Sequence, residues 1–354
     1  MQQSVTPIVL NGSFGEGGSA LFRAAITMSC LTQQPVRVHN IRGATRKPGL
    51  TSEDLTFLKV VGAACGADVS EIEPRASDMI FSPRHAPKPI RMRASVTEHE
   101  KGQVFGNACV IAESALTVLA RAGGISTVII EGETFNTNAL SYDSFEMATL
   151  RLHRKQGVYA FTRMEHAGFG HAGYGEFSLE VEPSVFGGFS WMKRGELRSV
   201  TALVSYADVQ DSFIARVDDQ LKTVFQQRDI AVEIEHHEVV SKARGSFITL
   251  VGEFEHGLGS SGILVPVGSR ADVAVQAVYN AFLDWYRGDA CVDPFLADQA
   301  LIAAAMSEEP TQFTTSNVTP RLLSIAWVIK QFLPVHLTIL GRESEPGTVK
   351  VSRS

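Results

Sequence analysis

The stretch Leu10-Asn11-Gly12-Ser13-Phe14-Gly15-Glu16-Gly17-Gly18-Ser19-Ala20-Leu21-Phe22-Arg23 decides the fold of this chain. It places a glycine-rich turn after a short apolar strand and before a helix that begins near Ser19. Glycines in such a turn let backbone N–H groups approach an anion at a helix N-terminus, where the helix dipole favours negative charge. The stretch therefore predicts a phosphate-binding turn. It matches neither the P-loop nor the complete dinucleotide fingerprint, so a tight turn without a ligand is the alternative.

Composition and charge limit the class of protein. The chain has 354 residues, of which 44% are hydrophobic and 20% charged, and this predicts a globular protein of two domains. No apolar run reaches the roughly 20 residues that span a bilayer, so no membrane partner is expected. The N-terminus lacks the pattern of a signal peptide, and the cysteines lack metal-ligand spacing. These features predict buried free thiols and a cytoplasmic location; the four cysteines are Cys30, Cys65, Cys109 and Cys291.

A net charge of −6 excludes a protein that coats nucleic acid through a broad cationic surface. A nucleic-acid partner would need a local basic site. The segments Arg42–Lys47 and Arg84–Arg93 are the candidates, and the second, which contains prolines, is expected to be a solvated loop.

A helix followed by a strand and a glycine occurs at three places. The helices are expected at 19–31, 105–121 and 321–331, and their strands at 36–41, 126–130 and 335–340. Hairpins are expected between Gln156 and Glu182. The region after Arg194 reads instead as strand, helix, strand, strand, with a further helix near Ala271, and a helix of the first kind resumes at Asp293. The pattern predicts a discontinuous large α/β domain (1–190 and 284–354) and an inserted α/β domain (191–283).

Four motifs in order resemble the RNA 3′-terminal phosphate cyclase family, and the likeness covers nearly the whole chain. They are Gly15-Glu16-Gly17-Gly18 with Arg23, Ile41-Arg42 with Lys47-Pro48-Gly49-Leu50, Phe295-Leu296-Ala297-Asp298-Gln299, and Phe332-Leu333-Pro334-Val335. The resemblance implies an α/β (α+β) fold of repeated βαβαββ units with a smaller insert, related to the enolpyruvyl transferases and to the C-terminal domain of translation initiation factor 3. An enolpyruvyl transferase itself is disfavoured, because those enzymes are typically longer and built of two similar domains.

In the family, a histidine takes AMP from ATP and passes it to an RNA 3′-phosphate, which then closes to a 2′,3′-cyclic phosphate. This is ligase-type adenylyl transfer in RNA processing. The resemblance implies a set of phosphate- or nucleotide-binding residues, comprising Glu16, Gly17, Gly18, Arg23, Arg42, Arg46, Glu53, Phe295, Asp298, Gln299 and Arg321. For Arg23, the alternative is an exposed helix residue paired with a nearby carboxylate such as Glu16.

Several positions depart from the family pattern. Arg321 stands where the family has its nucleophilic histidine, and a guanidinium that stays protonated has no lone pair to attack phosphorus. Thr45 replaces a second family arginine, for which Arg46 could substitute in part. Glu53-Asp54 replaces a Gln-His pair, and Phe295 replaces a tyrosine. These departures predict a protein that binds RNA 3′-phosphate ends, or a similar phosphate ligand, without forming a histidine-AMP intermediate.

Two alternatives remain open. An active ATP-dependent cyclase would need Mg²⁺ or Mn²⁺ and a displaced nucleophile, for which His171 and His336 are the candidates. Metal-dependent phosphodiester hydrolysis would instead use Glu16, Glu53 and Asp54 as ligands of a hard cation. Against that reading, Glu53 and Asp54 suit the solvated first turn of a helix that starts near Thr51. The expected partner is an RNA 3′-end or a nucleotide.

Overall fold

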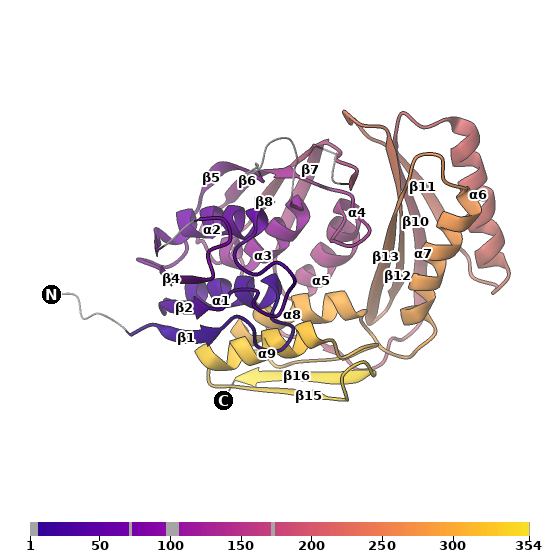
Figure 1. Cartoon of the computed structure of the whole chain (residues 1–354). Helices are drawn as coiled ribbons and strands as arrows, with labels where there is room; N and C mark the ends of the chain where they lie inside the picture. Colours follow the sequence, from indigo (N-terminus) through magenta and orange to yellow (C-terminus); the bar gives the residue numbers. More distant parts are fainter. Residues whose placement is uncertain (1–5, 71–72, 97–105, 171–173, 354) are drawn as a thin grey trace.

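The computed structural model describes all residues except 1–5, 71–72, 97–105, 171–173 and 354, and its described part contains the βαβαββ unit three times (Figure 1). The first unit consists of β1 (Ile8–Asn11), α1 (Ser19–Thr32), β2 (Val36–His39), α2 (Ser52–Cys65), β3 (Asp68–Val69) and β4 (Asp78–Ser82). The second consists of β5 (Arg91–Ser95), α3 (Ala108–Ala120), β6 (Ser126–Gly132), a helical segment, β7 (Ala160–His166) and β8 (Gly175–Val181). The third consists of β9 (Ser190–Trp191), α8 (Pro294–Met306), β14 (Thr311–Thr315), α9 (Pro320–Phe332), β15 (Val335–Leu340) and β16 (Gly347–Arg353).

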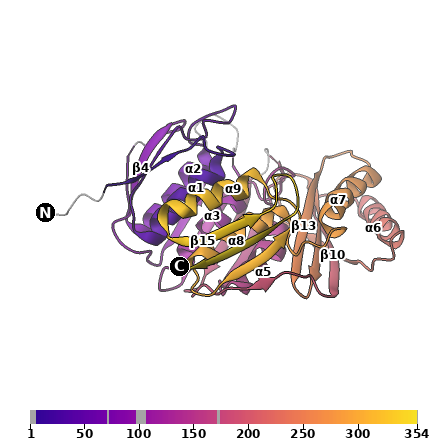
Figure 2. The same cartoon turned by 90° about the horizontal axis from the view of Figure 1, so that it is seen from below.

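Each unit forms a sheet with the same strand order. The orders are β1-β2-β4-β3, β5-β6-β8-β7 and β9-β14-β16-β15, so the first two strands of each unit pair directly and the last two form a hairpin. The first pair is parallel in every unit, and the hairpin is antiparallel. The helices lie between the sheets, where α1 contacts α2, α3 and α9, and α8 contacts α9 (Figures 1 and 2). The predicted α/β fold class with repeated units is therefore confirmed.

The helical segment of the second unit is interrupted. It runs through α4 (Tyr142–Ser144), the π-helix η1 (Phe145–Thr149) and α5 (Leu150–Lys155). A π-turn adds one residue to a helical turn, and such turns are frequent at functional sites. Here the segment lies against the sheet inserted between β9 and α8.

The insertion has a sheet and a core of its own. It contains β10 (Leu197–Ala207), α6 (Asp211–Gln226), β11 (Glu233–Glu238), β12 (Gly245–Phe254), β13 (Gly257–Val265) and α7 (Ala271–Tyr286). The strand order is β11-β10-β12-β13, and α6 and α7 cover the face turned away from the repeats (Figures 1 and 2). The apolar residues of α6 and α7 form a cluster separate from the main core.

The sequence reading of this insertion was incomplete. β13 was not predicted, because Gly257-Leu258-Gly259-Ser260-Ser261-Gly262 lacks the β-branched residues that mark a strand. The expected domain limit at 283 falls inside α7, whose apolar face continues through Trp285. The division into two domains stays a prediction.

Other local predictions were confirmed. The expected helices at 19–31 and 321–331 correspond to α1 and α9, and the hairpin between Gln156 and Glu182 is β7–β8. The start expected near Phe105 lies outside the described residues, and α3 is described from Ala108. Arg84–Arg93 is only partly the expected loop, because β5 begins at Arg91 and pairs with β6.

All four cysteines are buried and free, as predicted. They lie in the main core with the apolar faces of α1, α2 and α3. No helix in the described part of the chain is both long enough and apolar enough to span a bilayer.

Candidate functional site

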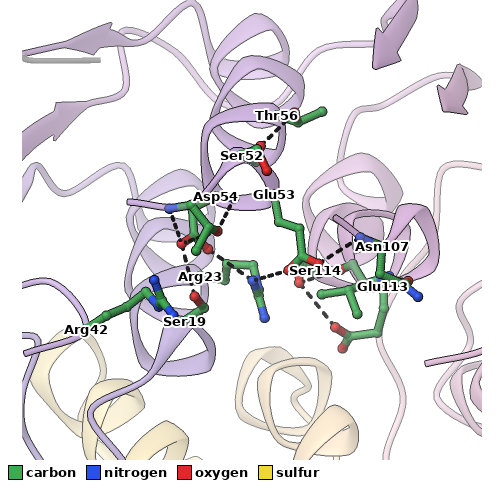
Figure 3. A network of polar contacts seen from close by, with 12 residues as sticks. Ser19, Arg23, Arg42, Ser52, Glu53, Asp54, Thr56, Asn107, Glu113 and Ser114 are labelled. Carbon is green, nitrogen blue, oxygen red and sulfur yellow. Dashed lines mark hydrogen bonds and ion pairs between the residues drawn. The ribbon is translucent and has the colours of Figure 1, made fainter. Parts of the chain in front are cut away.

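The N-terminal parts of α1, α2, α3, α8 and α9 bring polar side chains together. Figure 3 shows the residues that come from α1, α2 and α3. Ser19 of α1 donates a hydrogen bond to Asp54 of α2, over 3.0 Å between the oxygens. The backbone N–H of Asn107, just before α3, donates to Glu53 Oε1 at 2.7 Å. On the other side, Asp298 of α8 lies 3.6 Å from Arg321 of α9. The repeat architecture thus gathers residues that are far apart in the sequence.

Sequence explains why these helices begin where they do. Asp293 and Thr319 accept hydrogen bonds from first-turn N–H groups of α8 and α9, and a proline follows each cap. Thr51 and Asp54 form a reciprocal capping box at α2. α1 differs, since its N-cap is Gly18 and no side chain caps its first turn. The first-turn N–H groups of α1 are therefore free of any side-chain cap.

The glycine-rich turn packs against the loop that carries the first basic segment. Gly15 and Gly17 both have φ of +57°, a conformation that L-residues rarely adopt. A Cβ on Gly17 would lie 2.5 Å from the Ala44 Cβ, so no larger residue fits there. This close approach places the loop after Ile41 beside the start of α1.

Arg42 and Arg46 belong to this loop. Arg42 Nη1 donates to the Gly49 carbonyl oxygen at 3.1 Å, and the Arg46 side chain is exposed. Within the described part of the chain, neither arginine has a carboxylate at ion-pairing distance. Both charges are therefore available to an anion.

Arg23 is not paired with Glu16, the partner that the alternative reading suggested. Its Nη1 lies 3.0 Å from Asp54 Oδ1 and 3.6 Å from Glu53 Oε2 (Figure 3). The expectation of solvated carboxylates at the start of α2 was also wrong, because the Asp54 side chain is fully buried and Glu53 is only 25% exposed. Asp54 is buried because it accepts from Ser19, Arg23 and the Thr51 cap at once.

Arg321 is held between two carboxylates. Its Nε lies 3.7 Å from Glu16 Oε2 and 3.6 Å from Asp298 Oδ2. Glu16 is fixed in turn, since its backbone N–H donates to Ser324 Oγ at 2.9 Å. Arg321 remains 42% exposed, so it joins the carboxylates while still reaching solvent.

Glu113 of α3 was missed by sequence reasoning. Its charge interacts with both Arg23 and Arg321, and the side chain reaches toward Arg23 in Figure 3. A signal was present, because Glu113 is the only charged residue in the otherwise apolar or uncharged helix α3. Asn107 and Ser324, which fix Glu53 and Glu16, gave no comparable signal.

Burial dominates the electrostatics of these acids. It raises the pKa of Asp298 well above its usual range, although Arg321 opposes the shift. Burial also raises the pKa of Glu53 and Glu113, and Arg23 opposes both shifts. Burial would lower the pKa of Arg321, but Asp298, Glu16 and Glu113 together raise it. Arg321 is therefore cationic at every physiological pH.

The two remaining predicted residues of α8 differ in accessibility. Phe295 is 63% exposed, so its ring is open to a planar ligand. Gln299 Oε1 accepts a hydrogen bond from Thr149 of η1 at 2.9 Å, so its side chain is engaged by the helical segment of the second unit.

The structure describes one candidate nucleophile and the three candidate metal ligands of the two alternatives. His336 is exposed on β15, which follows the C-terminal end of α9. Arg321 is at the other end of α9, roughly 20 Å away at 1.5 Å per helical residue. His171 lies outside the described residues. Among the described residues, no group of three or more His, Cys, Asp or Glu side chains is arranged to hold a metal ion. The carboxylates expected to do so are engaged by Arg23 and Arg321.

Comparison with known proteins identifies the fold family. Residues 14–339 match the family model described as RNA 3′-terminal phosphate cyclase. The RNA 3′-terminal phosphate cyclase of Methylococcus capsulatus is 28% identical, over 98% of this chain and 97% of its own length. Proteins of the same name from Gloeothece citriformis (26% identical, 91% of this chain and 93% of theirs) and Archaeoglobus fulgidus (28% identical, 92% and 95%) also match. On this evidence, the chain belongs to the RNA 3′-terminal phosphate cyclase family.

Proposed function

We propose that this protein binds RNA ends that carry a 3′-phosphate and does not form a covalent histidine-AMP intermediate. One observation supports the proposed RNA binding. The uncapped start of α1 lies beside Arg42 and Arg46, which have no carboxylate partner in the described part of the chain. Backbone N–H groups, a helix dipole and two free guanidinium groups together favour a phosphate dianion.

The proposed absence of covalent chemistry rests on Arg321, which the motif resemblance places at the position of the family's nucleophilic histidine. A histidine attacks the α-phosphate of ATP through a nitrogen lone pair, whereas Arg321 presents only donors. The carboxylates of Asp298 and Glu16 hold its charge in place. We infer that Arg321 contributes a fixed positive charge to the site.

The nearby acids do not prevent phosphate binding. Arg23 and Arg321 each neutralise two carboxylates in part, and the raised pKa of Asp298 lets that group take up a proton when a phosphate adds negative charge. Where family members hold ATP, Gly17, Gly18, Arg23 and Phe295 are the residues that would contact it here. A bound nucleotide would supply phosphates and a base for Phe295 to stack on.

The binding test uses fluorescence anisotropy with one RNA oligonucleotide that ends in a 3′-phosphate or a 3′-hydroxyl. We expect tighter binding of the phosphorylated form, with an affinity that falls as salt rises. Arg42→Gln should weaken that preference about tenfold, the value of one charge-assisted hydrogen bond. Lys330→Gln, an exposed change at the far end of α9, is the matched control and should have no effect. Equal affinity for both RNA ends would refute the proposal.

The covalent test is intact-protein mass spectrometry after incubation with ATP and either Mg²⁺ or Mn²⁺. We expect the unmodified mass. An added AMP that is labile in acid would show a displaced histidine nucleophile and would establish the active-cyclase alternative.

A further inference from the structure

A second basic pocket lies on the inserted unit, outside the site described above. It is a cavity of about 230 Å³ between the loop before α6 and the loop before α7. Arg216, Arg244, Gln210, Ser246 and Ser269 supply its polar lining, and Phe213 supplies an aromatic face. Pockets for drug-sized ligands measure about 300–1,000 Å³, so this one suits a phosphate with part of a sugar.

The charges in this pocket are unbalanced. Arg216 and Arg244 are exposed, and neither has a carboxylate partner within the described ranges. By contrast, Arg270, which follows the lining residue Ser269 in the sequence, is paired with Asp272. The guanidinium carbon of Arg216 lies 6.0 Å from the centre of the Phe213 ring, at the limit of a cation–π contact.

Backbone donors add to the two arginines. Neither α6 nor α7 has a side-chain cap, and the residues that precede both helices line the pocket. Two uncapped helix N-termini therefore meet two unpaired guanidinium groups, which is an arrangement that favours an anion. The acids in the two first turns, Asp211 and Asp272, do not line the cavity.

A series of contacts through intermediate residues links the pocket to the candidate site. The Gly245 backbone, next to Arg244, lies against the ring of Phe169, which stacks on Phe135 at 5.0 Å. Phe135 lies two residues after Glu133, and Glu133 forms a β-bridge with Asn107. The backbone N–H of Asn107 in turn holds Glu53. Lys242 lies in the same loop as Arg244, and its Nζ is 5.4 Å from the centre of the Tyr174 ring. Arg244 and Lys242 are thus two cationic residues of the insertion that lie beside this series of contacts.

From this arrangement we propose that the pocket formed by Arg216, Arg244 and the starts of α6 and α7 binds a backbone phosphate of the RNA strand, upstream of its 3′-end. This inference rests on the proposed function, because it takes the ligand of the first site to be an RNA chain. The two places lie on different units of the chain, so we expect a dinucleotide to occupy only the first site and a longer strand to occupy both.

The experiment compares the parent protein with the double variant Arg216→Gln/Arg244→Gln. Arg228→Gln is the matched control, because Arg228 is exposed just past the other end of α6. Anisotropy titrations use a 3′-phosphorylated dinucleotide and a single strand of about twelve nucleotides, a length in the range that one binding module covers. Circular dichroism establishes that each variant is folded.

For the long strand, we expect the double variant to bind about tenfold more weakly, with a salt slope reduced by about 1.4, or 0.7 for each lost contact. Its affinity for the dinucleotide should equal that of the parent. Unchanged binding of the long strand, or an equal loss in Arg228→Gln, would each overturn the inference. Failure of the proposed function would give a different result. The parent protein would then bind RNA with a 3′-phosphate and RNA with a 3′-hydroxyl equally well, whatever the affinity of the double variant.

Discussion

Replacing Asp143 by asparagine should change how the stability of this protein depends on pH. Asp143 lies in α4 and is 3% exposed, and its Oδ2 accepts hydrogen bonds from Ser205 at 2.9 Å and Thr249 at 3.3 Å. These two hydroxyls belong to β10 and β12, so the carboxyl group joins the second repeat to the inserted sheet. Burial raises its pKa to about 7, and the two hydrogen bonds offset only part of that effect.

The sign follows from proton binding. The folded protein holds the Asp143 proton up to about pH 7, whereas the unfolded chain releases it near 4, so the folded state binds more protons between these values. The stabilising contribution is complete below pH 4 and is lost as the pH rises through 7. A shift of about 3 pKa units corresponds to about 4 kcal/mol, at roughly 1.4 kcal/mol for each unit.

Asparagine has the shape of the protonated acid and keeps an oxygen acceptor, but it cannot ionise. The free energy of unfolding of Asp143→Asn minus that of the parent should therefore rise by about 4 kcal/mol between pH 4 and pH 8. Guanidinium unfolding at intervals of pH gives both values. Asp219→Asn, an exposed change in α6, controls for the loss of one surface charge. If the curves for Asp143→Asn and the parent run parallel, the buried carboxyl group does not have the raised pKa.

Four further experiments test the site and the packing of the fold. Gly17→Ala should lower the free energy of unfolding by about 1–3 kcal/mol, because of its left-handed φ, and should weaken binding of 3′-phosphorylated RNA in anisotropy titrations. Arg194→Met should cost about 3 kcal/mol or more in urea unfolding, and Arg194→Lys should not rescue it, since the guanidinium donates to the carbonyl oxygens of Trp285, Tyr286 and Ala290. Binding of 3′-phosphorylated RNA should take up protons, as measured by calorimetry in two buffers of different ionisation enthalpy, and Asp298→Asn should reduce that uptake. The four buried cysteines should not react with a thiol reagent in the native protein and should all react in guanidinium.

Much of the fold could be predicted because its signals are local. The glycine exits and the helical spacing of apolar residues located α1, α9 and the strands that follow them. β13 escaped because a strand made of glycine and serine is stabilised by its pairing with β12, a long-range contact that leaves no local pattern. The predicted limit at 283 falls inside α7 for a similar reason: Trp285 packs in the insertion's core, and only the tertiary structure reveals that packing.

The residues of the candidate site were partly predictable, but their partners were not. Motifs identified Arg23, Arg42 and Arg321, each of which lies at the start of a helix or in a loop beside one. The pairing of Arg23 with Asp54 depends on how α1 packs against α2, and spacing along the chain does not encode that geometry. Glu113 was overlooked because a single acid on an apolar helix usually lies at the surface.

The pairing pattern separates the arginines of this site into two kinds. Arg23 and Arg321 are held by carboxylates, so their positions are fixed before any ligand arrives and little side-chain entropy is lost on binding. Arg42 and Arg46 have no such partner among the residues that the structure describes, so their charge is not offset there and can attract a phosphate from solution. In the proposed function, the fixed charges orient the 3′-phosphate end and the free charges capture it. Adenylyl transfer additionally needs a nucleophile with a lone pair, and within the described residues none of the groups that contact Arg321 supplies a histidine.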